Sequence, residues 1–101
     1  MVRHIVFFGL KDEALGHDKL YNARVIKQGL EGLADSIPFL RSAHVGINIP
    51  NAPRTNYDIA LVCDFDNMAD LASYHTHPEH LKVSEFIAQV KSDRSAVDYE
   101  Y

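Results

Sequence analysis

Apolar residues recur along the chain at two kinds of spacing, which distinguish expected strands from expected helices. Short runs rich in Ile, Val and Phe predict strands, and apolar positions three or four residues apart predict helices. The expected segments are, in chain order, a strand at 2–10, a helix at about 17–35, strands at 42–49 and 57–65, a short helix from 67 to about 74, a long helix from 78 to about 91, and a strand at 94–101. This βαββαβ order predicts an α+β, ferredoxin-like protomer, with a four-stranded antiparallel sheet and the helices on one face.

Capping residues mark the ends of the expected helices. Asp18 and Asn67 stand where a side-chain oxygen can accept hydrogen bonds from the free N–H groups of a first helical turn. Pro38 ends the first helix, and Pro78 suits the first position of the last one. The chain therefore breaks between two helices at residues 75–77, where His77 is placed to cap the second.

The sheet is expected to be apolar on both faces, although the helices can cover only one. Residues 5–8 and 59–63 are apolar throughout, whereas a strand with one solvated face alternates apolar and polar residues. The face left bare is expected to carry several of Val6, Phe8, Ile59, Leu61, Val97 and Tyr99. Because an exposed patch of this kind is unusual in a monomer, the pattern predicts a homodimer that packs sheet face against sheet face.

Composition and charge narrow the class of protein. The chain has 101 residues, of which 47% are hydrophobic and 24% charged, as is typical of one globular domain over residues 1–101. A net charge of −4 without any Lys/Arg cluster argues against nucleic acid and membrane partners. No apolar run approaches the ~20 residues of a membrane span, and the first residues are not expected to act as a signal peptide. We therefore expect a cytoplasmic protein that uses no cofactor.

Histidines are the side chains best suited to chemistry. Three of the six lie at positions 75, 77 and 80, but no carboxylate or cysteine completes a familiar metal-ligand spacing, so no metal site is expected. His4 lies in mid-strand among apolar neighbours, and an imidazole in an apolar pocket can exchange protons at neutral pH. Tyr74 is placed to orient the His4 ring or to donate a hydrogen bond to a carbonyl oxygen. His44, on the second strand, is a further candidate for the same pocket.

Five segments of the chain resemble the stress-responsive A/B barrel domain (Dabb) family. They are the opening Val-Arg-His-Ile-Val-Phe-Phe, Ile-Pro-Phe-Leu at 37–40, Tyr-Asp-Ile-Ala-Leu-Val-Cys-Asp-Phe at 57–65, Tyr-His-Thr-His-Pro-Glu-His at 74–80 and Val-Asp-Tyr at 97–99. The resemblance covers nearly the whole chain, and residues 74–80 are its most specific part. It implies a protomer that dimerises into an α+β barrel, in a family linked to stress or without an assigned reaction.

One branch of the family closes a linear polyketide by an aldol reaction without a metal. By position, the resemblance places the base of that branch on His80 and the assisting tyrosine on Tyr74. It also places His4 in the pocket wall and makes His77 the histidine before the proline. A third-strand histidine of that branch is replaced here by Ile59, which implies a less polar pocket.

Two functions are therefore expected as alternatives. In the first, each protomer of the homodimer has a small apolar ligand pocket, where His80, Tyr74 and His4 carry out acid/base chemistry of a cyclase or lyase kind on a small carbonyl compound. The side chains expected to contact the ligand are His77, His44, Val6, Phe8, Ile59 and Leu61. In the second, the protein is a non-enzymatic, stress-related structural dimer whose motif histidines fasten the helix break to the sheet.

Overall fold

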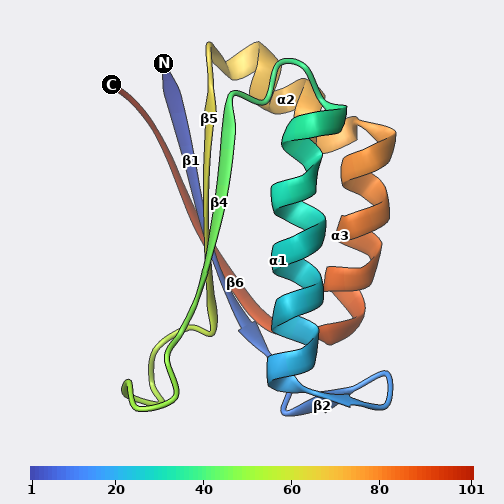
Figure 1. Cartoon of the computed structure of the whole chain (residues 1–101). Coiled ribbons are helices and arrows are strands. Elements are labelled where there is room, and N and C mark those ends of the chain that lie inside the picture. Colours follow the sequence, from blue (N-terminus) through green and yellow to red (C-terminus); the bar gives the residue numbers. More distant parts are fainter.

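Four antiparallel strands form one sheet in the order β4-β5-β1-β6, and the three helices pack on one side of it (Figure 1). The computed structural model describes all residues from 1 to 101. The elements are β1 (Val2–Leu10), β2 (Glu13–Ala14), β3 (His17–Asp18), α1 (Lys19–Ser36), β4 (Ser42–Ile47), β5 (Ile59–Phe65), α2 (Met68–Thr76), α3 (Pro78–Val90) and β6 (Lys91–Glu100). The expected α+β ferredoxin-like order is confirmed.

The small hairpin of β2 and β3 was not expected from the sequence. Its two turn residues, Leu15 and Gly16, have φ angles of 55° and 79°. Positive φ at both positions is typical of the tightest hairpin turns. With only two residues in each strand, there is no apolar alternation for a sequence pattern to detect.

The expected helix caps are confirmed. The side chain of Asp18 accepts a hydrogen bond from the backbone N–H of Tyr21 at the start of α1, and Asn67 caps α2 in the same way. His77 ends α2 and caps α3, because its Nδ1 accepts a hydrogen bond from the backbone N–H of Glu79 at 3.1 Å. None of the helices combines the length and the hydropathy needed to cross a membrane.

The hydrophobic core lies between the sheet and the helices. Alternate residues of β1 and β5 point into it, beginning with Val2 and Ile59, and meet buried residues of α1 and α3 such as Leu30 and Ile87. His4 is one of only two polar residues buried with this core. The face of β1 that carries His4 is therefore the face that the helices cover.

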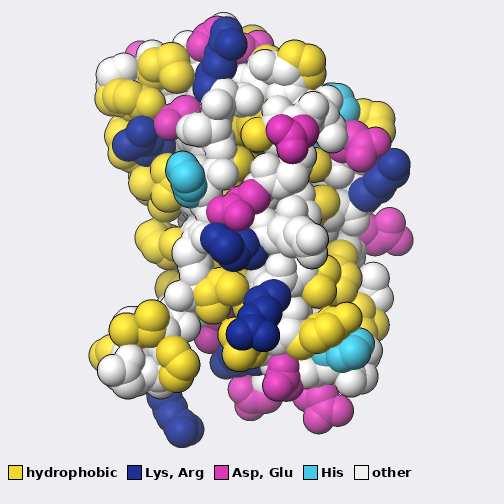
Figure 2. Space-filling view, viewed as in Figure 1, with side chains coloured by type: hydrophobic (Ala, Val, Ile, Leu, Met, Phe, Trp, Pro, Cys, Tyr) yellow, Lys and Arg dark blue, Asp and Glu magenta, His cyan; other side chains and the backbone are white.

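The opposite, uncovered face of the sheet is apolar, but most of the residues that the sequence placed on it lie on the other face. Figure 2 shows hydrophobic side chains along the side of the sheet that faces away from the helices. Val97 is 51% exposed and Tyr99 41% exposed there, next to Phe7 at 38%. The residues that lie beneath the helices instead are Val6, Phe8, Ile59 and Leu61. Because both faces of these strands are apolar, the alternation alone could not decide which face the helices cover.

A β-bulge interrupts the pairing of β1 with β6. Gly9 pairs with Asp93 and Leu10 with Lys91, so that Ser92 has no partner. A Cβ at Gly9 would lie only 3.1 Å from the Ser92 hydroxyl oxygen, so glycine suits this close approach. A bulge adds one residue to one strand and thereby shifts the alternation of its side chains.

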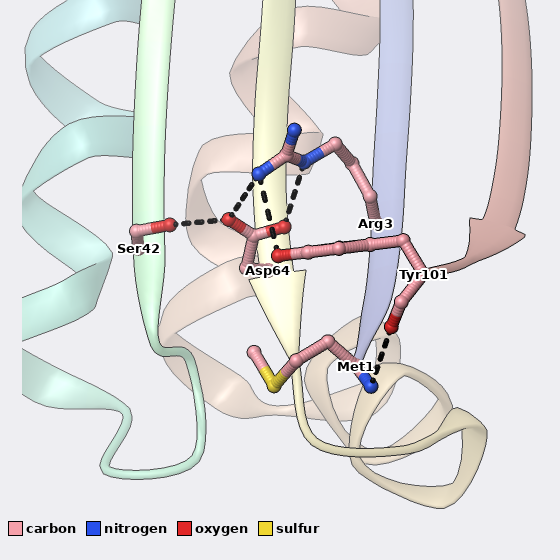
Figure 3. Close-up of polar contacts among 5 residues, drawn as sticks. All are labelled: Met1, Arg3, Ser42, Asp64 and Tyr101. Carbon is pink, nitrogen blue, oxygen red and sulfur yellow. Dashed lines mark hydrogen bonds and ion pairs between the residues drawn. The ribbon is translucent and has the colours of Figure 1, made fainter.

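A polar cluster stands at one end of the uncovered face (Figure 3). Arg3 on β1 donates to both carboxylate oxygens of Asp64 on β5, at 2.9 and 3.0 Å, and the Ser42 hydroxyl on β4 donates to the same carboxylate. Arg3 also donates to the Tyr101 hydroxyl. The hydrogen bonds from Arg3 hold the pKa of Asp64 below its usual range. The cluster ties β1, β4 and β5 to the residue that follows β6.

Candidate functional site

A cavity of about 300 Å³ lies between the sheet and helices α2 and α3, within one protomer. Four imidazole or phenol groups line it, together with apolar, small and basic side chains. The lining residues are His4, Val6, Phe8, Leu30, Leu61, Tyr74, His75, His80, Ser84, Ile87, Ala88, Lys91 and Arg94. Because Val6, Phe8, Ile59 and Leu61 were expected both to lie on the bare face of the sheet and to contact the ligand, the expected pocket lay on that face. That placement is corrected, because the face that carries His4 is covered by the helices.

His4 forms a carboxylate–imidazole pair with a residue near the end of β6. Its Nδ1 lies 2.5 Å from Oδ1 of Asp98, its direct neighbour across the β1–β6 pairing. A carboxylate can only accept, so Nδ1 carries the proton and Nε2 has its lone pair free when the ring is neutral. His4 is 3% exposed and Asp98 side chain 36%, so the pair reaches from the cavity to the protein surface.

His80 is fixed in a similar way by the helix break. Its Nδ1 lies 3.2 Å from the backbone oxygen of His75, in the last turn of α2. Because that carbonyl only accepts, Nδ1 is the protonated nitrogen and Nε2 is left as an acceptor. Burial and the nearby charges of His75, His4 and Arg94 lower the pKa of His80 below its ordinary value. A neutral imidazole with a free Nε2 has the properties required of a general base.

His75 completes a row of three imidazoles. Its ring centroid lies 5.2 Å from that of His4 and 5.6 Å from that of His80. Burial is the main cause that lowers the pKa of His75, and His4 and Arg94 lower it further. Since each additional positive charge in this row would repel the others, the cavity favours the neutral rings of His75 and His80.

Tyr74 is fully buried in the wall of the cavity. Its ring centroid lies 4.4 Å from that of His80 and 5.1 Å from that of Phe65. The hydroxyl interacts with the Cys63 thiol, a weak hydrogen-bonding group, but makes no hydrogen bond of normal geometry. Burial raises the pKa of Tyr74 well above its ordinary value, so the phenol stays protonated and can donate.

Three residues that the sequence nominated as ligand contacts do not line this cavity. His44 lies on the uncovered face of the sheet, since it pairs with Val62, whose side chain points away from the helices. Ile59 is buried in the core, where its neighbour in β4 is Ile47. The ring of His77 caps α3 instead. The structure does bring together His4, Tyr74 and His80 with Val6, Phe8 and Leu61.

Five polar residues of the site were not nominated as functional: His75, Ser84, Lys91, Arg94 and Asp98. His75 was considered only as a metal ligand, and no group of three or more His, Cys, Asp or Glu side chains is placed to hold a metal ion. Asp98, Arg94 and Lys91 lie on β6, and their relation to His4 depends on the register between the first and last strands. The alternation of residues 94–101 places Arg94 and Asp98 on one face of the strand. This shared face was the only sequence signal that could have linked these two residues to the site.

The amino-acid sequence matches the model of the stress responsive A/B barrel domain over residues 2–101. This chain belongs to the Dabb family. No curated protein sequence matches this Dabb protein. Among solved structures, a dimeric protein of unknown function with a ferredoxin-like fold from Bacteroides fragilis is 38% identical, with a TM-score of 0.88 over 99% of this chain and 95% of that one.

Two further structures extend the comparison for the Dabb protein. A dimeric ferredoxin-like protein of unknown function from Thermobifida fusca is 29% identical, with a TM-score of 0.82 over 99% of this chain and 90% of that one. The hydroxynitrile lyase from Passiflora edulis is 20% identical, with a TM-score of 0.79 over 97% of this chain and 90% of that one. At that identity the lyase shares the fold alone.

Proposed function

We propose that this Dabb protein is a homodimer whose protomers each bind a small carbonyl compound in the cavity beside His80 and act on it by acid/base chemistry. The observation that carries the proposal is the state of His80. Its Nδ1 donates to the backbone oxygen of His75, its Nε2 is free to accept, and its pKa is lowered.

The reaction would begin at the carbon next to the carbonyl group. His80 Nε2 takes a proton from that carbon, and the electron pair of the broken C–H bond moves into the enolate. Tyr74, which stays protonated, donates a hydrogen bond to the enolate oxygen. His80 Nε2 then returns a proton to that carbon, and His4, oriented by Asp98, is a second imidazole whose free Nε2 can accept a proton.

The unpartnered hydroxyl of Tyr74 supports a ligand at this place. A buried hydroxyl without a partner costs about 1–3 kcal/mol, and a carbonyl oxygen that reached it after a small movement of the cavity wall would recover that cost. The cavity is also small enough to select small molecules, at the lower end of the usual range for ligand pockets. The lyase from Passiflora edulis is an enzyme with the same fold, although its sequence identity is too low to support any assignment of catalytic residues.

The homodimer is proposed to form through the uncovered face of the sheet. Phe7, Val97 and Tyr99 are each between 38% and 51% exposed there. Both the Bacteroides fragilis and the Thermobifida fusca proteins are described as dimeric. A second copy would remove this apolar area from water, which is the main driving force for association.

Proton exchange at a small ketone tests the catalytic proposal directly. We expect the protein to accelerate the exchange of the methyl protons of acetophenone in D₂O, followed by ¹H NMR. His80→Gln should lower the rate by about 10²–10⁴-fold, as loss of a general base does. His44→Gln is the matched control, because it makes the same change on the other face of the sheet. Equal exchange rates in both variants would contradict the role of His80.

The non-enzymatic structural dimer is the second candidate, and the position of His77 favours it. This histidine caps α3 and lies against Phe39, with the ring centroids 6.3 Å apart, so it fastens the helix break as a structural role requires. If the second candidate is correct, no ketone is exchanged and no small carbonyl compound raises the melting temperature. His77→Ala would then lower stability by about 1 kcal/mol, as other lost caps do, and would change nothing else.

A further inference from the structure

The solvent-facing end of the cavity carries two positive charges that no carboxylate neutralises. Lys91 is half-buried and Arg94 is exposed, and both line the cavity. Neither side chain forms an ion pair or hydrogen bond, whereas half of the ten Lys and Arg residues are in ion pairs; these are Arg3, Lys19, Lys27, Arg41 and Lys82. No Asp or Glu lines the cavity, and the carboxylate of Asp98 is bound to His4.

The bulge in β6 is what places both charges at the cavity. In a regular strand, residues 91 and 94 point to opposite faces, because side chains alternate with a period of two. Here Ser92 is unpaired, so Lys91 is the neighbour of Leu10 and Arg94 the neighbour of Phe8. Leu10 and Phe8 both point toward the helices. The irregularity therefore gives two cations to one site in a chain whose net charge is −4.

We propose that Lys91 and Arg94 bind the carboxylate of a small oxo acid, whose carbonyl group then lies beside Tyr74 and His80. This inference rests on the proposed function of the same cavity and names its substrate class. The planar fork of a guanidinium matches the two oxygens of a carboxylate, and an ammonium group adds a second charge. A cavity of about 300 Å³ has room for a small organic acid rather than for a large ligand.

The imidazoles respond to the same charges. Arg94 contributes to the lowered pKa of both His75 and His80. A bound carboxylate offsets the charge of Arg94, so binding should raise the pKa of both rings. The carboxylate would thus hold the substrate and also make His80 a stronger base.

The test compares a carboxylate with its neutral counterpart. The probes are 4-oxo-4-phenylbutanoate and its primary amide, with binding measured by isothermal titration calorimetry on the whole protein. We expect the wild type to prefer the acid by about tenfold or more. Arg94→Gln and Lys91→Gln should each reduce that preference, and the double variant should abolish it. Arg24→Gln, which removes an exposed and unpaired charge on α1, is the matched control and should keep the preference.

The failure of the anion site and the failure of the proposed function give different binding results. If the wild type binds acid and amide equally, and Tyr74→Phe weakens both, the anion site is refuted while the carbonyl site stands. If neither probe binds at millimolar concentration, both proposals fail. If inorganic phosphate binds as tightly as the oxo acid, and loses affinity equally in Arg94→Gln, the assignment to an oxo acid is overturned. NMR titration should show the pKa of His80 rising with the acid and not with the amide.

Discussion

Removing the hydroxyl of Tyr74 should make the protein more stable while it damages the site. The Tyr74 ring is completely buried, and its hydroxyl oxygen has no hydrogen-bond partner of normal geometry. In the unfolded chain the same hydroxyl is solvated, so folding costs its desolvation without a compensating bond. Tyr74→Phe keeps the ring and its packing against Phe65 and His80 and removes only this cost.

The magnitude follows from the usual cost of an unsatisfied buried group, about 1–3 kcal/mol. Part of that gain is lost because the space of the oxygen atom is left empty, so we expect a net stabilisation of about 1 kcal/mol. For a chain of this length such a change raises the melting temperature by roughly 4–8 °C. Urea and thermal unfolding should be compared at one fixed protein concentration, because the stability of the proposed dimer would depend on concentration.

Tyr57→Phe is the matched control. Its hydroxyl donates to Asp93 at 3.0 Å and lies 2.7 Å from the Ser95 hydroxyl, so its loss should lower stability by about 0.5–1.5 kcal/mol. The two variants delete the same atom and should have opposite signs. Destabilisation by Tyr74→Phe as large as that by Tyr57→Phe would show that the Tyr74 hydroxyl has a partner, and would remove this support for a ligand site.

Four other outcomes are expected. The pKa values of His75 and His80 are lowered in the folded protein, so below about pH 6.5 the unfolded state binds more protons than the folded state. The free energy of unfolding should therefore fall as the pH decreases from 6.5 toward the folded-state pKa values. Urea unfolding measured at several pH values should show a smaller fall in His80→Gln. Burial raises the pKa of the Cys63 thiol to about 12, so iodoacetamide should label the native protein at pH 8 far more slowly than the unfolded chain. Val97→Lys on the uncovered face should convert the proposed dimer to monomers in analytical ultracentrifugation, and an unchanged mass would refute the proposed interface. Asp98→Asn should slow ketone exchange but leave the oligomeric state unchanged, because the carboxylate acts on the cavity imidazoles His4 and His75 and not on the proposed interface; an unchanged exchange rate would remove His4 from the mechanism.

The fold could be predicted well because local signals and long-range packing agree. The first strand was expected at residues 2–10, which are its observed bounds, and the caps at Asp18 and Asn67 hold as expected. Errors fall where local signals are weak. β5 begins at Ile59 rather than at residue 57, and β6 begins at Lys91, where α3 passes directly into the strand.

The site could be predicted only in part. His4, Tyr74 and His80 were nominated together, and the structure places them around one cavity. His44 was misplaced because alternation shows which residues share a face but not which face meets the helices. Asp98 and Arg94 were missed because their neighbours in β1 are more than 80 positions away, and only the strand register reveals them.

β6 has consequences for how the family can diverge. One face of this strand carries Arg94 and Asp98 toward the cavity, and the opposite face carries Val97 and Tyr99, which belong to the proposed contact with a second copy. A single-codon insertion or deletion between residues 93 and 94 would exchange these two sets in one step. Relatives that keep the pocket and the pairing should therefore keep the length of this segment constant, and a relative with a changed length should have lost both.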